Sequence, residues 1–197
     1  MLDNLSNYRL ILASNSPRRR ELLQGLGVNY EVRTLPDVDE SYPDTLSGGE
    51  IPLYIACEKA QAYRPLLQKN ELMITADTIV WMDGRVLGKP ADRTEAEAML
   101  HLLSGASHRV YTGVALTTQA WQRSFVAETE VRFAPLSDDE IAYYLDRFRP
   151  YDKAGAYGVQ EWIGYIGVEY MRGSYFNVRG LPVQRLYQEL KAVSAPV

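Results

Sequence analysis

The sequence is poor in cysteine and contains no long hydrophobic run. Cys57 is the only cysteine among 197 residues, which excludes an internal disulfide framework and the paired Cys/His spacing of a zinc site. No window approaches the roughly 20 apolar residues that a membrane-spanning helix needs. The first residues also lack the charged and then apolar pattern of a secretory signal. We therefore expect a cytoplasmic protein with no membrane partner.

A basic excess is also missing, as are several well-known catalytic patterns. The formal net charge is -4, which argues against a general nucleic-acid binder. No Ser/His/Asp or Cys/His nucleophile arrangement stands out, and neither Walker-A nor Rossmann glycine spacing is present. The two histidines, His101 and His108, have no companions, so we expect structural roles for both. Any catalysis must therefore depend on other side chains.

What is present is the pattern of an α/β protein. The apolar content of 46% and charged content of 23% are typical of a globular domain, and we expect a single domain over residues 1–197. Strands and helices interleave without a strict βαβ rhythm, which predicts a mixed α/β fold with a bent, partly antiparallel sheet and flanking helices. The expected strands cover 10–13, 30–35, 72–82, 85–88, 109–118, 124–135 and 165–171. The expected helices cover 17–26, 52–67, 94–103 and 137–148, and a last helix begins at Pro182. The 52–67 helix is expected to carry Leu53, Ala56, Cys57 and Ala60 on one face. Thr94 with Glu97 and Ser137 with Glu140 have the form of capping boxes, and Asp83-Gly84 is a hairpin signal.

The most informative stretch runs from Ser14 to Leu23. Ser16 is a good N-cap, and Pro17 suits the first position of a helix, where its missing N–H costs nothing. Three consecutive arginines, 18–20, then fall at the electropositive end of that helix, where cations are unfavourable for stability. Free N–H groups, a helix N-terminus and clustered arginines together predict a phosphate site. The alternative is a solvated basic helix start.

A second group of residues fits a metal–phosphate site. Asp77 lies inside an otherwise apolar predicted strand, where a carboxylate is unfavourable unless it has a partner. Backbone donors could satisfy it as a purely structural acid. Hard oxygen ligands and lysines are, however, what a magnesium–phosphate site needs, because the metal takes few protein carboxylates and several phosphate oxygens. The candidates for the same site are Asp39, Glu40, Glu58, Lys59 and Lys89, of which the first two belong to an acidic loop, residues 37–40.

Two further segments are weaker signals. Lys89 follows a predicted strand and precedes Pro90, which restricts its backbone. The glycine-rich segment 152–160 allows close backbone approach and ends on Gln160, whose amide could read the edge of a base. Each has an ordinary alternative, a solvated lysine in the first case and a simple turn in the second.

The order of these pieces resembles the Maf-type nucleoside triphosphate pyrophosphatases over about the full length. The matching motifs are Ser14 to Leu23, Asp39-Glu40, Glu58-Lys59-Ala60, Ala76-Asp77-Thr78, Gly88-Lys89-Pro90, Leu103-Ser104-Gly105, Thr112-Gly113-Val114, Asp152 to Gly158, Gly173-Ser174-Tyr175 and Gly180-Leu181-Pro182. The resemblance implies an inosine triphosphatase-like fold with a cleft between two lobes. It also implies cleavage of a nucleoside triphosphate to the monophosphate and pyrophosphate with a divalent cation, Mg²⁺ or Mn²⁺.

The resemblance also implies roles for individual residues. Asp77 is the implied acid/base residue and Glu40 the supporting carboxylate, both at the metal, with Lys89 beside them in the catalytic set. Ser14, Arg18, Lys59 and Lys89 are the implied phosphate ligands, while Thr78 and Gln160 are implied substrate-binding residues. The expected partner is the nucleotide itself, with no nucleic acid, and a homodimer is compatible with the family.

Three positions separate the subfamilies. Arg18, Thr78 and Gln160 are similar to the group that acts on dTTP and UTP, whereas Trp, Gln and Glu mark the group that acts on 7-methyl-GTP. A neutral amide such as Gln160 can both donate to and accept from a uracil or thymine edge. The alternatives are 7-methyl-GTP pyrophosphatase activity, or a nucleotide-binding regulator of septum formation with little activity. The sequence departs from the family at Glu161, where Gly is common, and at Arg179, where an apolar residue is common.

Overall fold

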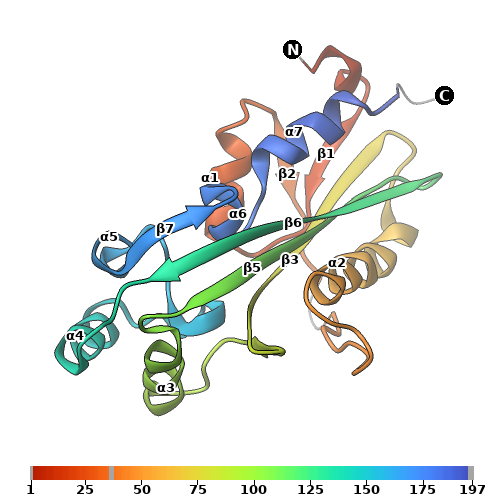
Figure 1. Cartoon of the computed structure of the whole chain (residues 1–197). Helices are drawn as coiled ribbons and strands as arrows, with labels where there is room; N and C mark the ends of the chain where they lie inside the picture. The colour runs from red at the N-terminus through yellow and green to blue at the C-terminus, as the bar shows by residue number, and fades with distance from the viewer. Residues whose placement is uncertain (1, 36–37, 195–197) are drawn as a thin grey trace. The chain divides into compact units, whose positions relative to one another are not determined.

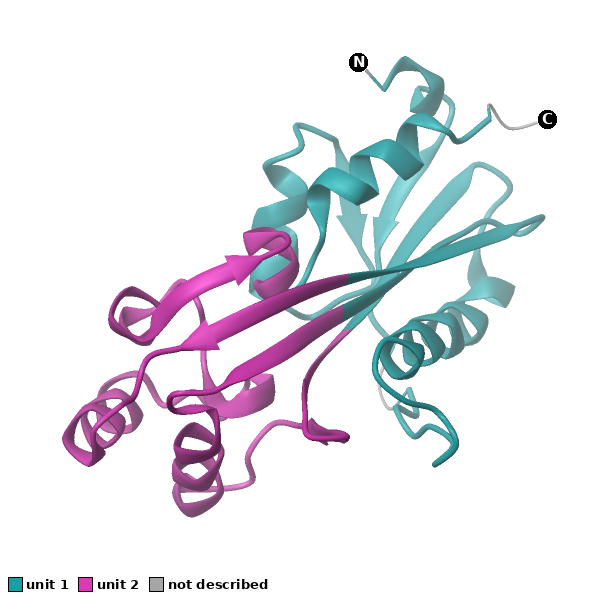
Figure 2. Ribbon diagram, viewed as in Figure 1, with its two compact units in different colours: residues 1–77, 112–127, 180–197 teal, residues 78–111, 128–179 magenta. Residues whose placement is uncertain are grey.

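The computed structural model describes residues 2–35 and 38–194. The chain divides into two compact units (Figure 2). Unit 1 comprises 1–77, 112–127 and 180–197, and unit 2 comprises 78–111 and 128–179. None of the helices in the described ranges is long and apolar enough to cross a membrane.

Seven strands form a mixed sheet in the order β2-β1-β3-β5-β6-β7, with β4 paired to β3 (Figure 1). The strands are β1 (Arg9–Leu12), β2 (Tyr30–Val32), β3 (Glu71–Met82), β4 (Arg85–Leu87), β5 (Ser107–Thr117), β6 (Gln122–Phe133) and β7 (Val168–Arg172). Strand β1 is parallel to β2 and β3, whereas β3 with β4 and β6 with β7 are antiparallel. This arrangement confirms the predicted α/β class with a partly antiparallel sheet.

The helices follow the predicted order with two additions. They are α1 (Pro17–Gln24), α2 (Glu50–Tyr63), α3 (Arg93–Leu103), α4 (Asp138–Phe148), α5 (Trp162–Gly167), α6 (Tyr175–Val178) and α7 (Val183–Lys191), with short 3₁₀ turns η1 (Asp3–Leu5), η2 (Arg64–Leu66) and η3 (Ala154–Ala156). Helices α5 and α6 were not predicted. Strand β7 therefore begins at Val168 rather than at Tyr165, and β2 ends at Val32, short of the predicted residue 35.

Unit 1 is built on the two faces of strands β1 and β3. Alternate residues of a strand point to opposite faces, and Leu10 and Leu12 pack in one cluster with Leu186 of α7, whereas Ile11 packs in another with Ala60 of α2. Figure 1 shows α7 and α2 on opposite sides of these strands. Both faces are thus covered, as buried parallel strands require.

The apolar face of α2 differs from the prediction. Ala56 and Ala60 are buried as expected, but Leu53 and Cys57 are only half-buried. The helix begins at Glu50, two residues earlier than predicted, and its buried side runs through Ile51, Pro52, Ile55, Ala56, Ala60 and Tyr63. The first turn of α2 lies directly on β5, because a Cβ at Gly113 would stand 2.3 Å from the carbonyl oxygen of Pro52.

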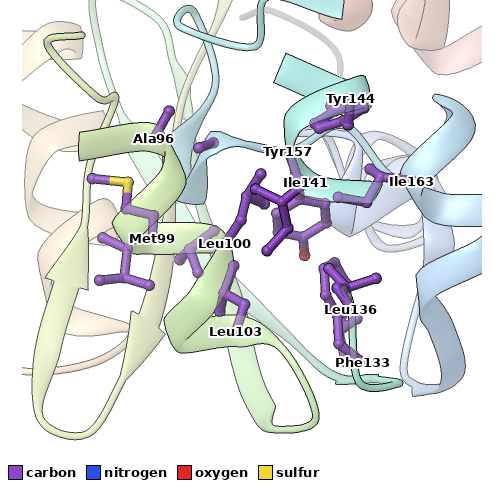
Figure 3. Packing of buried hydrophobic residues seen from close by; sticks show 14 of the residues in the cluster. Ala96, Met99, Leu100, Leu103, Phe133, Leu136, Ile141, Tyr144, Tyr157 and Ile163 are labelled. Atoms are coloured by element: carbon purple, nitrogen blue, oxygen red, sulfur yellow. The ribbon is translucent and has the colours of Figure 1, made fainter. Parts of the chain in front are cut away.

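Unit 2 has its own core between α3, α4 and the sheet (Figure 3). Tyr157 lies in the middle of the cluster and packs edge-on against Phe133, with ring centroids 5.0 Å apart. Its hydroxyl is 2.7 Å from Nε2 of the buried His108, and burial lowers the pKa of His108 to about 4. His108 therefore lies in the core as a neutral ring, consistent with its expected structural role.

The start of α3 corrects a sequence prediction. The N-cap is Asp92 rather than Thr94, and its carboxylate accepts from the backbone N–H of Glu95 at 2.9 Å. Glu95 in turn accepts from Ala91, so the capping residues stand two positions earlier than predicted. The second predicted capping box, Ser137 with Glu140 at the start of α4, is confirmed.

A buried carboxylate at the start of β3 gives unit 1 a testable acid sensitivity. Glu71 has no exposed side-chain surface and receives two hydrogen bonds from Arg33, at 2.7 and 2.9 Å. These bonds lower the pKa of Glu71 from 4.5 to about 2. Because the pKa of Glu71 is lower in the folded state than its ordinary value of 4.5 in the unfolded chain, the ionised carboxylate stabilises the fold above pH 4.5. This stabilisation is lost as the pH falls toward 2.

We expect Glu71→Gln to lower the free energy of unfolding by roughly 3 kcal/mol near neutral pH. The difference from wild type should shrink as the pH falls from 4.5 toward 2, because the wild-type carboxylate is protonated first in the unfolded state and then, near pH 2, in the folded state as well. Urea unfolding at several pH values measures both effects. Glu31→Gln is the matched control, since Glu31 pairs with Arg9 at a side-chain exposure of 55%, and such pairs contribute about 0.5 kcal/mol. An equal effect of both substitutions at all pH values would contradict the prediction.

Candidate active site

The turn from β1 into α1 is built as the sequence predicted. Ser16 caps α1 by accepting from the backbone N–H of Arg19 at 3.4 Å, and Pro17 is the first helical residue. Ser14 is buried directly after β1, and its hydroxyl oxygen accepts from the N–H of Ser16 at 3.2 Å. Arg18 is half-buried in the first turn. No acidic residue occupies that turn, so the dipole and the arginines make it electropositive.

The structure brings three of the predicted residues of unit 1 together around one ammonium group. Lys59 Nζ lies 2.9 Å from Asp77 Oδ1 and 2.8 Å from Glu40 Oε1. The side chains of Lys59 and Asp77 are only 13% and 14% exposed, whereas that of Glu40 is 55% exposed. Lys59 is therefore a charged partner of the carboxylate inside β3.

The fold explains why Lys59 reaches Asp77. Thr75 of β3 donates its hydroxyl to the carbonyl oxygen of Ala56 in α2 at 2.7 Å. Lys59 follows Ala56 by three residues along the helix, and Asp77 follows Thr75 by two along the strand, so each lies on the same face as the residue that forms this bond. The contact between helix and strand thus places the ammonium and the carboxylate opposite each other.

Arg19 belongs to the predicted arginine cluster, but the sequence predicted no individual role for it. Its Nε donates to the carbonyl oxygen of Gly180 at 2.8 Å. Burial lowers the pKa of Arg19, while the carboxylates of Asp77 and Glu40 act in the opposite direction. Arg19 therefore lies in the electrostatic field of the same two carboxylates. The arginine run and the Gly180 motif were visible in the sequence, but their contact depends on the tertiary fold.

Glu40 and Asp77 are a donor set that fits a metal shared with a substrate. Two other candidates are placed differently: Asp39 accepts from the backbone N–H and the hydroxyl of Ser41, both at 2.8 Å, and Glu58 is exposed on α2. Within the described ranges, no three or more His, Cys, Asp or Glu residues are grouped as metal ligands. Mg²⁺ commonly binds one or two protein carboxylates and completes its shell with phosphate oxygens and water. The pair has the ligand type and number for that arrangement.

The remaining predicted residues belong to unit 2. Thr78 follows Asp77 in β3 and is half-buried, and Lys89 is exposed after β4. The carbonyl oxygen of Gly88 accepts from the N–H of Gly155 at 3.0 Å, which joins the segment of Lys89 to the glycine-rich segment. Gln160 is half-buried at the end of that segment. Within unit 2, the two weaker sequence signals are thus connected by a backbone hydrogen bond.

The departure at Glu161 also has a structural explanation. Its carboxylate accepts from the hydroxyl of Tyr144 and lies 3.0 Å from the ammonium of Lys153. Gly158 stands against this pair, since a Cβ there would lie 2.9 Å from Cδ of Glu161 and 3.0 Å from Cε of Lys153. Both carboxylate oxygens of Glu161 therefore have a partner.

Comparison with known proteins identifies the relatives of this chain. A family model described as Maf-like protein matches residues 9–193. A protein of Bacteroides fragilis named dTTP/UTP pyrophosphatase is 65% identical over 191 residues, covering 97% of this chain and 99% of the relative. Proteins of the same name from Parabacteroides distasonis and Porphyromonas gingivalis are 61% and 54% identical, each over 97% of this chain and over 99% and 97% of their own lengths. The structure of a HAM1 protein from Coxiella burnetii aligns over 94% of this chain and 100% of that chain, with a TM-score of 0.50 and 18% identity, which supports the fold class alone.

Proposed function

The chain belongs to the Maf-like protein family, and on this premise we propose that it is a nucleoside triphosphate pyrophosphatase that hydrolyses dTTP and UTP. The products are the nucleoside monophosphate and pyrophosphate. The observation that carries the proposal is the contact of Lys59 with both Asp77 and Glu40, at 2.9 and 2.8 Å. It sets a general base, a second carboxylate and a phosphate-binding cation side by side. Relatives at 54–65% identity with the name dTTP/UTP pyrophosphatase support the substrate assignment.

In the proposed mechanism, Asp77 takes a proton from a water molecule that attacks the α-phosphorus. A water oxygen–phosphorus bond forms, the bond from the α-phosphorus to the bridging oxygen breaks, and pyrophosphate leaves with the electron pair. Lys59 contacts both carboxylates and fixes their positions, so Asp77 is held in place to accept the proton. A divalent cation held by Glu40 and Asp77 would neutralise phosphate charge when bound.

Binding of the triphosphate is assigned to the electropositive groups. Ser14 and Arg18 belong to the start of α1, where backbone N–H groups and the helix dipole favour an anion. Arg19 adds a guanidinium held near the carboxylates, and a guanidinium can bind phosphate oxygens in pairs. Lys89, exposed after β4, is assigned to the leaving pyrophosphate. These groups stabilise charge that develops on the leaving group.

The proposed function is tested with purified protein and a panel of dTTP, UTP, dCTP, GTP and 7-methyl-GTP. Released pyrophosphate and orthophosphate are measured separately, so that a pyrophosphatase is distinguished from a phosphatase. We expect pyrophosphate from dTTP and UTP at the highest kcat/KM of the panel. Preference for 7-methyl-GTP would support the other subfamily. Nucleotide binding without turnover would support the regulator of septum formation instead.

Gln160, with Arg18 and Thr78, is the proposed source of pyrimidine selectivity. Gln160→Glu keeps the side-chain length but removes the donor and adds a charge, so a base carbonyl would face a carboxylate. We expect kcat/KM for dTTP to fall about tenfold or more, the equivalent of roughly 1–3 kcal/mol. The control is Gln184→Glu, which makes the same change on the exposed side of α7. An unchanged kcat/KM for dTTP in a folded Gln160→Glu variant would remove Gln160 from the base site.

A further inference from the structure

One phenol oxygen holds both sides of the turn that contains Gln160. Tyr144 is fully buried on α4, and its hydroxyl accepts from the backbone N–H of Gly158 at 3.0 Å. The same hydroxyl donates to the carboxylate of Glu161. Gly158 and Glu161 also bond directly, because the N–H of Glu161 donates to the carbonyl oxygen of Gly158 at 2.9 Å. Gln160 therefore lies in a turn that is closed by its own backbone and fixed from outside by Tyr144.

The carboxylate of Glu161 contacts Tyr144 and Lys153 and does not cap the helix that follows it. Glu161 is the N-cap residue of α5, but its side chain makes no capping hydrogen bond. It lies instead between Tyr144 and Lys153, whose side chain is 10% exposed. Glutamate is not among the residues that normally cap a helix, and here its carboxylate contacts Tyr144 and Lys153 instead.

The surrounding residues leave little room for movement. A Cβ at Gly158 would lie 2.9 Å from Cδ of Glu161 and 3.0 Å from Cε of Lys153, so adding one would displace this pair of side chains. On the other side of Gln160, a Cβ at Gly164 would stand 1.8 Å from the carbonyl oxygen of Val159. Burial, together with the hydrogen bond to Glu161, raises the pKa of Tyr144. The phenol therefore stays protonated and acts as the hydrogen-bond donor to the carboxylate of Glu161.

We propose that Tyr144, Glu161 and Lys153 form a clamp that fixes the backbone of Gln160 and thereby sets the selectivity of the enzyme for the pyrimidine base. The inference rests on the proposed function, in which the amide of Gln160 contacts the base. An amide distinguishes two bases only if it is held within a few tenths of an ångström of the pairing geometry. The three clamp residues are positioning residues, because they act through Gln160 and not on the nucleotide.

The test compares dTTP with dCTP, whose base carries an amino group and a ring acceptor where thymine has a carbonyl and an N–H. In Tyr144→Phe the ring remains, while the N–H of Gly158 and the carboxylate of Glu161 lose their shared partner. We expect the ratio of kcat/KM for dTTP to that for dCTP to fall about tenfold, because the amide is then poorly held. Tyr143→Phe is the matched control: Tyr143 is the preceding residue of α4, is 48% exposed, and contacts Trp162 through its ring.

Tyr144→Phe in a Gln160→Ala background distinguishes an effect on the position of Gln160 from a general loss of activity. If the clamp acts through Gln160, Tyr144→Phe should leave the ratio unchanged once Gln160 is absent. An equal loss of activity toward dTTP and dCTP in both backgrounds would show a merely structural role and overturn the clamp.

Glu161→Gln provides a second variant in case Tyr144→Phe fails to fold. It keeps an acceptor for Tyr144 but removes the charge opposite Lys153, so we expect a smaller fall of the ratio in the same direction. Circular dichroism and thermal melting establish folding. If the wild-type protein hydrolyses neither dTTP nor UTP, the proposed function and the clamp fall together. If it hydrolyses them and the ratio is unchanged in a folded clamp variant, the clamp alone is overturned.

Discussion

Asp77→Asn is expected to lower the turnover of dTTP about 100-fold or more while the fold is retained. The amide has nearly the shape of the carboxylate, and its oxygen can still accept from Lys59, whose ammonium is 2.9 Å from Asp77 in the wild type. The variant therefore changes basicity far more than packing. A general base that cannot take the proton of the attacking water loses the contribution that proton transfer makes to the rate.

The control for this experiment is Asp146→Asn, which also removes a carboxylate from an ion pair. Asp146 pairs with Arg93 on unit 2 and is 68% exposed. We expect its turnover to stay within about a factor of two of wild type, because exposed pairs contribute little. Steady-state kinetics with pyrophosphate detection gives turnover, and thermal melting shows whether both variants are folded. Near-wild-type turnover of folded Asp77→Asn would mean that another group activates the water.

Helix starts and turns were predicted correctly where the residues that form them are neighbours in the sequence. Ser16 and Pro17 start α1, and Ser137 with Glu140 starts α4, because each cap is formed by residues adjacent in the chain. The hairpin at Asp83-Gly84 follows the same logic, since both residues have positive φ, 50° and 77°. In the candidate site, the need of Asp77 for a partner followed from its apolar neighbours in the sequence, but the identity of that partner did not.

Features decided by tertiary contacts could not be read from the sequence in the same way. Thr94 and Asp92 are both capable N-caps, and the backbone conformation selects Asp92. The predicted strand over 165–171 began three residues too early, because residues 165–167 belong to α5. In that helix Gly164 lies directly against the carbonyl oxygen of Val159. The contact between Arg19 and the carbonyl oxygen of Gly180 joins residues that are 161 positions apart in the sequence, so it depends on the tertiary fold.

Lys59 links the two parts of the proposed chemistry, because it touches both carboxylates and is itself a cation suited to phosphate. Removing it has two physical consequences. Asp77 and Glu40 lose the positive charge that lies within 3 Å of both, so the repulsion between the two carboxylates is less well compensated. The leaving pyrophosphate also loses a cation that stabilises developing charge, and such a loss costs about 100-fold or more in rate.

Lys59→Met is therefore expected to lower kcat/KM for dTTP by about 100-fold to 1000-fold. Methionine replaces the long stem of lysine without its charge. The free energy of unfolding should fall by only roughly 1–3 kcal/mol, because Glu40 is 55% exposed and can be solvated when its partner is lost. Lys59→Arg should retain an intermediate activity, since the charge remains but a planar guanidinium does not reproduce a single ammonium between two oxygens.

Lys69→Met makes the same replacement at an exposed position of unit 1, and it should leave kcat/KM unchanged. Kinetics at several concentrations of Mg²⁺ adds a second readout for Lys59→Met. If the lysine acts mainly by neutralising the carboxylate pair, more metal should restore part of the lost rate, because a divalent cation can take over that neutralisation. If it acts mainly on the phosphates, saturating metal should leave the loss in place. Wild-type kcat/KM in a folded Lys59→Met variant would contradict both the neutralising role and the phosphate-binding role of Lys59. Its contact with Asp77 and Glu40 would then be a purely structural ion pair.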